Sequence, residues 1–226
     1  MNKNEEGLWR VGVDASLQVV FEDPACPALL RQALAGPISW HARNETPVAQ
    51  ALKSPRLAPE WVAGLLALGA TLIFESGAEN SLTSLLQKEV AGEPTELRVA
   101  LNAKRWGAAR VARTPADEPI VAAVAGMTFG RNGNGDGNVV AEARLALVGA
   151  WSEAVRLARA TDQLVGETLG EEQIEAVARA LMREVAPQGD YLGSETYRRE
   201  MAGVLARRAL RACLFQMAEM AEEVGA

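Results

Sequence analysis

The amino-acid sequence predicts an α+β protein whose second part holds an antiparallel sheet packed against helices. Two apolar or alternating runs, 120–129 and 139–150, flank a Gly/Asn-rich segment, which is the pattern of a β-hairpin. Three helical patterns follow, at about 153–166, at 171–185 and after Ser194. Strands followed by helices are typical of an α+β layer domain.

The first part mixes strands and helices less regularly. The apolar positions of 8–20 predict a short strand region. Asp23-Pro24 predicts a helix start, with Asp as the N-cap and Pro at the first helical position, and Gly36-Pro37 ends this helix. From Ile38 to Pro59 three prolines interrupt the pattern, so we expect a loop-rich stretch there.

Regular elements resume at Pro59. Pro59-Glu60 begins a second helix that carries Trp61, Leu65 and Leu68 at helical spacing, and Gly69 ends it. Four shorter elements follow: a strand at 71–75, a short helix at 81–87, and strands at 97–101 and 108–113. A boundary near 102–107 predicts two domains, 1–103 and 104–226.

Composition limits the function. The chain has 226 residues, a formal net charge of −6 and 49% hydrophobic residues, and its pI is near 5.1. This acidic balance argues against nucleic acid or an anionic membrane as the main partner. No apolar run reaches the ~20 residues that span a bilayer, and the acidic start is not a secretory signal. We therefore expect a cytoplasmic protein, with Cys26 and Cys213 as buried thiols.

No motif for self-contained catalysis or metal binding occurs, so we expect neither catalytic nor metal-ligating residues in this chain. His41 is the only histidine and has no matching nucleophile or paired acid. The segment 131–138 alternates oxygen-bearing side chains like a calcium loop, but a calcium loop needs a closing glutamate where Ala143 stands. A hairpin tip is the simpler interpretation. The arginines of the last helix are expected to form a solvated or interface face.

Several segments, in order, resemble the flavin (medium) subunits of molybdenum hydroxylases, the xanthine and carbon monoxide dehydrogenase family. In the second part these are Val-Ala-Arg-Thr-Pro-Ala-Asp-Glu-Pro-Ile-Val-Ala-Ala-Val-Ala (111–125), the strand at 143–150, and 186–211 with the last helix. In the first part, Trp9-Arg10-Val11-Gly12-Val13-Asp14-Ala15 and 23–30 resemble the strand and helix of the family's second flavin subdomain. The resemblance implies that 104–226 is a flavoprotein C-terminal domain.

The family carries an Arg-Asn-x-x-Thr-x-Gly-Gly-Asn loop against FAD, and this chain has Arg43-Asn44-Glu45-Thr46-Pro47-Val48-Ala49-Gln50 at that place. The resemblance therefore implies Arg43, Asn44 and Thr46 as contacts to FAD. The glycine pair is replaced by Val48-Ala49. Glycines let a backbone approach a phosphate closely, and valine does so poorly. No Gly-Gly-Thr phosphate loop precedes residue 8, so we expect 1–103 to be a truncated, decayed flavin domain.

The resulting prediction is a medium-subunit-like component of a molybdenum hydroxylase complex, structural or assembly-related, with FAD binding lost or weakened. The resemblance implies a molybdopterin-binding large subunit and a small [2Fe–2S] subunit as partners. Two alternatives stay open. One is a functional FAD-binding electron-transfer subunit whose phosphate loop comes from another chain. The other is a free-standing protein that binds a different small ligand.

Overall fold

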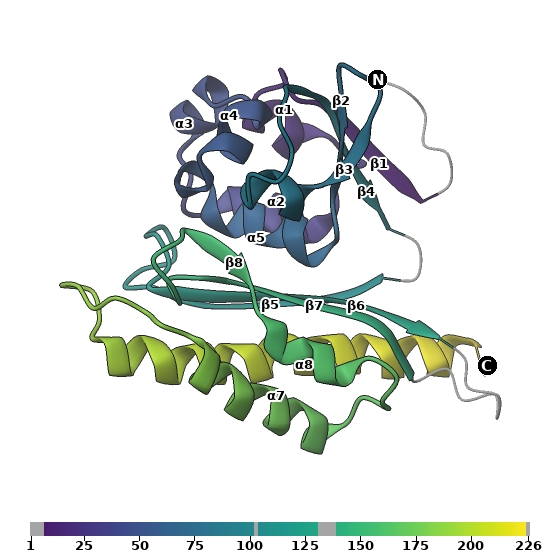
Figure 1. The fold of residues 1–226 in the computed structure, drawn as a ribbon, viewed down its shortest axis with the longest axis vertical. Helices are drawn as coiled ribbons and strands as arrows, with labels where there is room; N and C mark the ends of the chain where they lie inside the picture. The colour runs from purple at the N-terminus through teal and green to yellow at the C-terminus, as the bar shows by residue number, and fades with distance from the viewer. Residues whose placement is uncertain (1–6, 102–103, 131–138, 225–226) are drawn as a thin grey trace.

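The computed structural model describes residues 7–101, 104–130 and 139–224. Within these ranges the chain forms two four-stranded antiparallel sheets, with strand orders β1-β4-β2-β3 and β5-β6-β7-β8. Figure 1 shows the second sheet between two layers, with the first half of the chain above it and α7 and α8 below it. The sheet on which the C-terminal half is built is therefore covered on both faces.

The first half consists of one small sheet and a set of short helices. Its strands are β1 (Leu8–Gly12), β2 (Thr71–Phe74), β3 (Glu79–Ser81) and β4 (Pro94–Ala100). Its helices are α1 (Leu17–Glu22), α2 (Ala28–Ala35), α3 (Trp40–Glu45), α4 (Val48–Lys53), η1 (Pro55–Leu57), α5 (Pro59–Ala67) and α6 (Leu82–Leu86). Helix α5 is the centre of this half, because every residue from Glu60 to Ala67 is buried.

The second half consists of a longer sheet followed by helices. Its strands are β5 (Lys104–Val111), β6 (Val121–Gly130), β7 (Val139–Val148) and β8 (Val155–Leu157). Its helices are η2 (Arg159–Leu164), α7 (Glu171–Glu184) and α8 (Glu195–Val224). The register places Ala122 opposite Val148 and Gly126 opposite Arg144, so β6 and β7 form the predicted hairpin. The tip at 131–138 lies outside the described residues.

Small residues let helices approach this sheet closely from both sides. A Cβ at Gly126 would come within 2.1 Å of the Ala67 carbonyl oxygen at the end of α5, and a Cβ at Gly107 within 2.1 Å of the Ala209 carbonyl oxygen in α8. The alternation of side chains along β6 then divides the core. Ala122 and Val124 pack with the first half, whereas Ala123 and Ala125 pack with the helices below.

The structure confirms the α+β class and several elements. The helix from Pro59, the strand from Thr71, the short helix within 81–87 and the helix from Glu171 all occur. Ser194 caps α8 as expected, because its Oγ accepts a hydrogen bond from the Tyr197 N–H at 3.2 Å. The domain boundary at 103/104 stays a prediction; the two sheets lie on either side of it.

In the first half, the strand predicted within 8–20 occurs as β1, which ends at Gly12, and Ser16 then caps α1. Two other predictions were wrong. Asp23 does not start a helix at Pro24: its carboxylate accepts hydrogen bonds from the Ala25 N–H and the Trp9 indole N–H, both at 2.9 Å. The helix begins at Ala28 instead. The stretch 38–59 is mostly helical rather than loop-rich, because Pro47 and Pro55 precede or start helical turns instead of breaking them.

In the second half, the predicted helix at 153–166 was wrong. Val155–Leu157 instead pairs with Ala146–Val148 as β8, and the chain then turns through the 3₁₀ helix η2. Pairing with a sheet edge overrides the weak local preference of this segment for helix.

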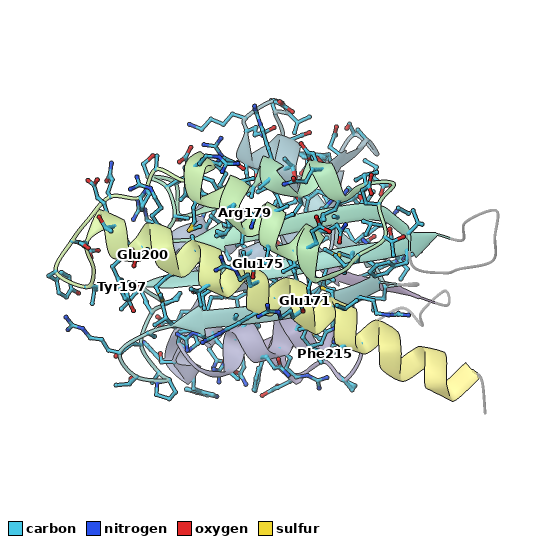
Figure 2. The ribbon with its side chains drawn as sticks, turned by 90° about the horizontal axis from the view of Figure 1, so that it is seen from below. Glu171, Glu175, Arg179, Tyr197, Glu200 and Phe215 are labelled. Carbon is cyan, nitrogen blue, oxygen red and sulfur yellow. The ribbon has the colours of Figure 1, made fainter. Side chains whose placement is uncertain are left out.

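The arginines of α8 divide between two environments, so the expected solvated or interface face was wrong for Arg198. Arg207 and Arg211 pair with Glu175 and Glu171 of α7, at 2.8 and 2.7 Å. Figure 2 shows these two glutamates on the side of the molecule where α7 and α8 lie next to each other. Arg198, in contrast, is 6% exposed, and its partners are described below.

Candidate functional site

The segment predicted to contact FAD forms two consecutive short helices. Ser39 caps α3 through a hydrogen bond from the Ala42 N–H to its Oγ, at 3.2 Å. Helix α3 ends at Glu45, and Thr46 follows as its C-cap. Pro47 has extended backbone angles and directs the chain into α4. The three candidates Arg43, Asn44 and Thr46 therefore lie within one helical turn, but in three different environments.

Arg43 is buried, and its side chain forms hydrogen bonds in the interior of the first half. Its Nε donates to Gln18 Oε1 at 2.8 Å, and its Nη1 donates to the carbonyl oxygens of Leu34 and Ile38, at 2.9 and 2.6 Å. The guanidinium also lies 4.5 Å from the centre of the Phe21 ring. These contacts join α3 to α1 and to the end of α2.

Asn44 and Thr46 differ from Arg43 and from each other. Asn44 is exposed, and its Nδ2 donates to the Trp40 carbonyl oxygen at 2.8 Å. Thr46 is 9% exposed. The Thr46 N–H donates to the Ala42 carbonyl oxygen at 3.0 Å, and its own carbonyl oxygen accepts from the Leu17 N–H at 2.9 Å.

The backbone donors of this segment are used within the chain. The N–H groups of Val48 and Ala49 donate to the carbonyl oxygens of Ala15 and Val13, at 2.9 and 2.8 Å, and that of Gln50 donates to Pro47. Pro47 itself has no N–H. Each N–H between Thr46 and Gln50 therefore already has a carbonyl partner. As arranged here, the segment does not fit the role of a backbone cradle for a phosphate.

A second feature lies where the two halves meet. A cleft of about 400 Å³ is lined by Arg56 and Pro59 from the first half and by Glu118, Gly149, Trp151 and Arg198 from the second. The Arg56 Nη2 donates to the Ser152 carbonyl oxygen at 3.4 Å. The cleft therefore has a planar aromatic side chain and charges of both signs.

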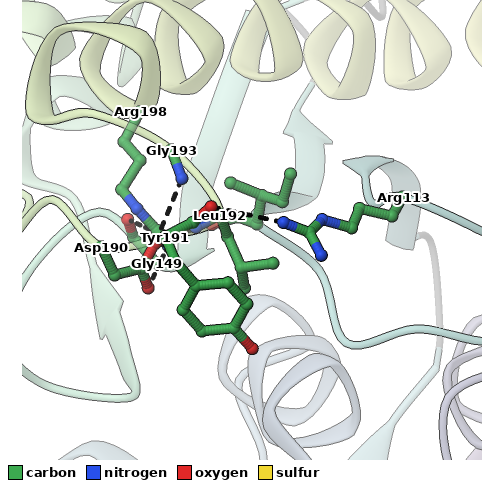
Figure 3. Close-up of polar contacts among 8 residues, drawn as sticks. Arg113, Gly149, Asp190, Tyr191, Leu192, Gly193 and Arg198 are labelled. Atoms are coloured by element: carbon green, nitrogen blue, oxygen red, sulfur yellow. Dashed lines mark hydrogen bonds and ion pairs between the residues drawn. The ribbon is translucent and has the colours of Figure 1, made fainter.

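Arg198 shapes this cleft. It donates through Nη1 to the carbonyl oxygens of Ile120 and Gly149, and through Nη2 to Asp190. Figure 3 shows the Arg198 side chain extending toward Asp190 and Gly149, beside the turn that continues through Tyr191, Leu192 and Gly193. Gly149 has a positive φ of 73°, and a Cβ there would come within 2.2 Å of the Ile120 carbonyl oxygen. Only glycine fits that position.

Sequence reasoning missed the cleft, although a signal was present. Asp190 and Gly193 stand three residues apart before the cap Ser194, which is a turn pattern. The Asp190 Oδ1 accepts from the N–H groups of Leu192 and Gly193, at 2.9 and 3.1 Å. The pKa of Asp190 is below its ordinary value, mainly because of the hydrogen bond from Arg198. Desolvation opposes this shift, and the two backbone hydrogen bonds add to it.

Two other titratable groups, buried Glu60 and half-buried Lys104, lie at the contact between the halves. Burial raises the pKa of Glu60, and nearby Arg110 partly opposes this shift. The Arg110 Nε lies 3.0 Å from Glu60 Oε1, whereas Oε2 has no hydrogen-bond partner among the described residues. Burial lowers the pKa of Lys104, whose Nζ donates to the Leu68 carbonyl oxygen.

The described residues offer few groups for other chemistry. Cys26 and Cys213 are free and buried, as expected, and burial raises the pKa of each thiol to about 12. His41 is exposed and lies 3.3 Å from Glu45. In the ranges 7–101, 104–130 and 139–224 no group of three His, Cys, Asp or Glu side chains could hold a metal ion. No described helix is long and apolar enough to cross a membrane.

Comparison with known proteins identifies the class. The fold matches chains of oxidoreductases in solved structures. Quinoline 2-oxidoreductase from Pseudomonas putida 86 has a TM-score of 0.75 and 23% identity over 95% of this chain and 78% of that chain. Carbon monoxide dehydrogenase from Hydrogenophaga pseudoflava has a TM-score of 0.75 and 20% identity over 94% of this chain and 77% of that chain. At these identities the matches show a shared fold.

Sequence similarity gives the family. The CO dehydrogenase flavoprotein C-terminal domain matches residues 109–213, from β5 to α8. The uncharacterized protein YgfM of Escherichia coli K12 is 30% identical over 202 residues, which cover 89% of this chain and 71% of YgfM. The chain belongs to the CO dehydrogenase flavoprotein family.

Proposed function

We propose that the chain is a medium-subunit component of a molybdenum hydroxylase complex in the cytoplasm, with a structural or assembly role and with FAD binding lost or weakened. Family membership supports the assignment to such a complex. The use of every backbone N–H from Thr46 to Gln50 within the chain supports weakened FAD binding, and this single observation carries the proposal.

A weakened contact between this segment and the FAD phosphates follows from the donors that a phosphate needs. A phosphate is usually held by free backbone N–H groups of a glycine-rich turn or a helix N-terminus. To release the N–H groups of Val48 and Ala49, the chain would have to break their bonds to Ala15 and Val13. Val48 is fully buried, so this movement would also expose apolar surface. Both costs reduce the free energy available for binding FAD.

The partners in this proposal are a molybdopterin-binding large subunit and a small [2Fe–2S] subunit. The similar Hydrogenophaga pseudoflava structure is that of a carbon monoxide dehydrogenase lacking the Mo-pyranopterin moiety of its molybdenum cofactor, so the complete enzyme uses molybdenum. We extend a molybdenum partner to this chain through its family membership.

One observation favours the alternative, in which the chain is a functional electron-transfer subunit completed by another chain. Arg43, Asn44 and Thr46 lie together at the end of α3, in the segment that resembles the family's FAD-contacting loop. In that case Asn44 and Thr46 would touch FAD. Arg43, whose guanidinium is held by Gln18, Leu34 and Ile38, would hold the segment in place.

The test is purification of the tagged chain from its own host, together with whatever co-purifies. The visible spectrum and identification of any released flavin then separate the two functions. We expect partners that contain molybdenum and iron–sulfur centres, with flavin well below one equivalent of this chain. A near-stoichiometric flavin that is retained by this chain would establish the electron-transfer subunit instead. A colourless chain without partners would refute both.

A further inference from the structure

A cavity of about 690 Å³ lies beside β8, between the two halves of the chain. Leu66 of α5 and Leu86 of α6 form its wall on the side of the first half, and Ala143, Val155 and Thr161 contribute to the wall of the second. It shares no residue with the α3–α4 segment, and it shares only Glu153 with the cleft at Arg198. It is therefore independent of the proposed flavin contact.

The cavity exists because β8 covers only the end of β7. Three residues of β8 pair with Ala146–Val148, and the chain then leaves the sheet through η2. It returns at Val140, whose N–H donates to the Glu167 carbonyl oxygen at 2.9 Å and whose carbonyl oxygen accepts from Gly166. Between these contacts, residues 141–144 of β7 have no partner strand on this side within the described chain. The segment 158–166 thus arches over an uncovered part of the sheet.

The segment 158–166 limits which kind of ligand can occupy the cavity. An extended peptide that adds to a strand edge needs an edge that is open at its ends. Here the edge is blocked at one end by the bond from the Ala158 N–H to the Leu145 carbonyl oxygen, at 2.8 Å, and at the other end by Val140. A compact small molecule fits under the arch, and about 690 Å³ lies within the usual range of roughly 300–1,000 Å³ for ligand pockets.

The lining is apolar with charged side chains at its edge. Leu66 is 3% and Val155 8% exposed, whereas Val165 is 54% exposed. Short side chains at Ala141 and Ala143 leave the space open. An apolar floor of this kind binds a hydrophobic body through area removed from water.

The charges at the cavity indicate which polar group the ligand carries. Arg144 pairs with Glu142 and Arg156 with Glu153, the latter at 3.8 Å. Arg159 also lines the cavity and is exposed, and among the described ion pairs it takes part in none. A guanidinium that has no carboxylate partner suits a carboxylate or sulfonate of a ligand.

The acids limit the charge of the ligand. Glu142 and Glu153 are paired, but Asp162, one turn after Arg159, also lines the cavity. A second negative charge on the ligand would face Asp162 and be repelled. We propose that this cavity binds a small amphipathic monoanion, with its apolar body against Leu66, Leu86 and Val155 and its carboxylate on Arg159.

The test uses the fluorescent anion anilinonaphthalene sulfonate as the probe on the whole folded chain, at low salt. We expect saturable binding of one equivalent and displacement by decanoate but not by decanol. Arg159→Gln should weaken probe binding about ten-fold, since one charge-assisted hydrogen bond is lost. Gln87→Trp, at the exposed edge of the cavity, should block the probe without disturbing the core.

The matched control is Arg183→Gln, which removes one exposed positive charge from α7, away from the cavity lining. It should leave probe binding unchanged. Circular dichroism of each variant establishes that the fold is intact. Binding that is unsaturable, that decanol displaces as well as decanoate does, or that Gln87→Trp and Arg159→Gln leave unchanged would overturn the proposal.

Discussion

The Nη2 atom of Arg198 lies 2.7 Å from both carboxylate oxygens of Asp190. The arginine side chain is 7% exposed and that of the aspartate 44%, so the pair extends from the interior to the cleft surface. The same guanidinium binds the carbonyl oxygens of Ile120 and Gly149. One side chain therefore connects the start of β6, the end of β7 and the turn before α8.

The Arg198–Asp190 pair should make the free energy of unfolding depend on pH in the acid range. The pKa of Asp190 is lowered from its ordinary value of 3.8 in the folded state. Its contribution is thus complete above that value and disappears as the pH falls through the lower, folded pKa. Asp190→Asn should cost about 1 kcal/mol of unfolding free energy near pH ~7, a modest figure because solvent screens the exposed carboxylate.

Urea unfolding at several pH values measures this effect. The difference between the wild-type chain and Asp190→Asn should shrink toward zero in acid, whereas Asp14→Asn, at an exposed position, should match the wild type throughout. A difference that is independent of pH would mean that the turn geometry, rather than the ion pair, is what the substitution removes.

Replacing Arg43 should damage the fold, and replacing Asn44 should not. Arg43→Ala leaves the buried carbonyl oxygens of Leu34 and Ile38 without their donor, at an expected cost of about 2–4 kcal/mol. Asn44→Ala removes one exposed bond to Trp40 and should cost less than about 0.5 kcal/mol. Thermal and urea unfolding compare the two. Equal stability of both variants would contradict the interior role of Arg43.

Glu60 should make the contact between the halves less stable as the pH rises. Its pKa is raised by burial, so the folded state favours the protonated acid, and this stabilisation is lost as the pH passes through the folded pKa. Glu60→Gln should therefore gain stability relative to the wild type between mildly acidic and neutral pH. Unfolding of both proteins across this interval tests it, with exposed Glu75→Gln as the control.

The sign of the stability change in Glu60→Gln decides between two effects on Glu60. A Glu60→Gln variant that loses stability relative to the wild type as the pH rises would mean that attraction by Arg110, 3.0 Å away, outweighs the cost of burial.

The close approach of α5 to the second sheet should depend on Gly126. A Cβ at Gly126 would come within 2.1 Å of the Ala67 carbonyl oxygen, whereas among the described residues a Cβ at Gly130 of the same strand would meet only the Ala141 side chain, at 3.8 Å. Gly126→Ala should cost about 1–3 kcal/mol by overpacking, and Gly130→Ala little. Denaturant unfolding of the two variants measures the difference. Equal costs would show that α5 can move away from the sheet.

Local patterns predicted some elements well. Pro59-Glu60 begins α5, the apolar runs form β6 and β7, and Ser194 caps α8, because each signal acts within a few residues of where it stands. The secondary structure of 153–166 depended instead on the pairing of Val155–Leu157 with Ala146–Val148. A pairing between distant segments leaves little trace in the local sequence.

The environments of Arg43 and Arg198 could not be predicted from the local sequence either. The resemblance located the segment at Arg43, but not that the guanidinium is held by Gln18, 25 residues away. Likewise, helical spacing on α8 could not distinguish Arg198 from Arg207. Which of them is buried depends on where the Gly149 turn and Asp190 come to lie.

Coverage of β6 on both faces has a consequence for how the chain can be divided. Ala122, Val124, Ala146 and Val148 belong to the core of the first half, while their neighbours on the same strands belong to the core below. A fragment beginning at β5 would present an apolar sheet face to water and be prone to self-association. The halves should thus melt in a single cooperative transition, and a cut between the sheets would yield two insoluble pieces.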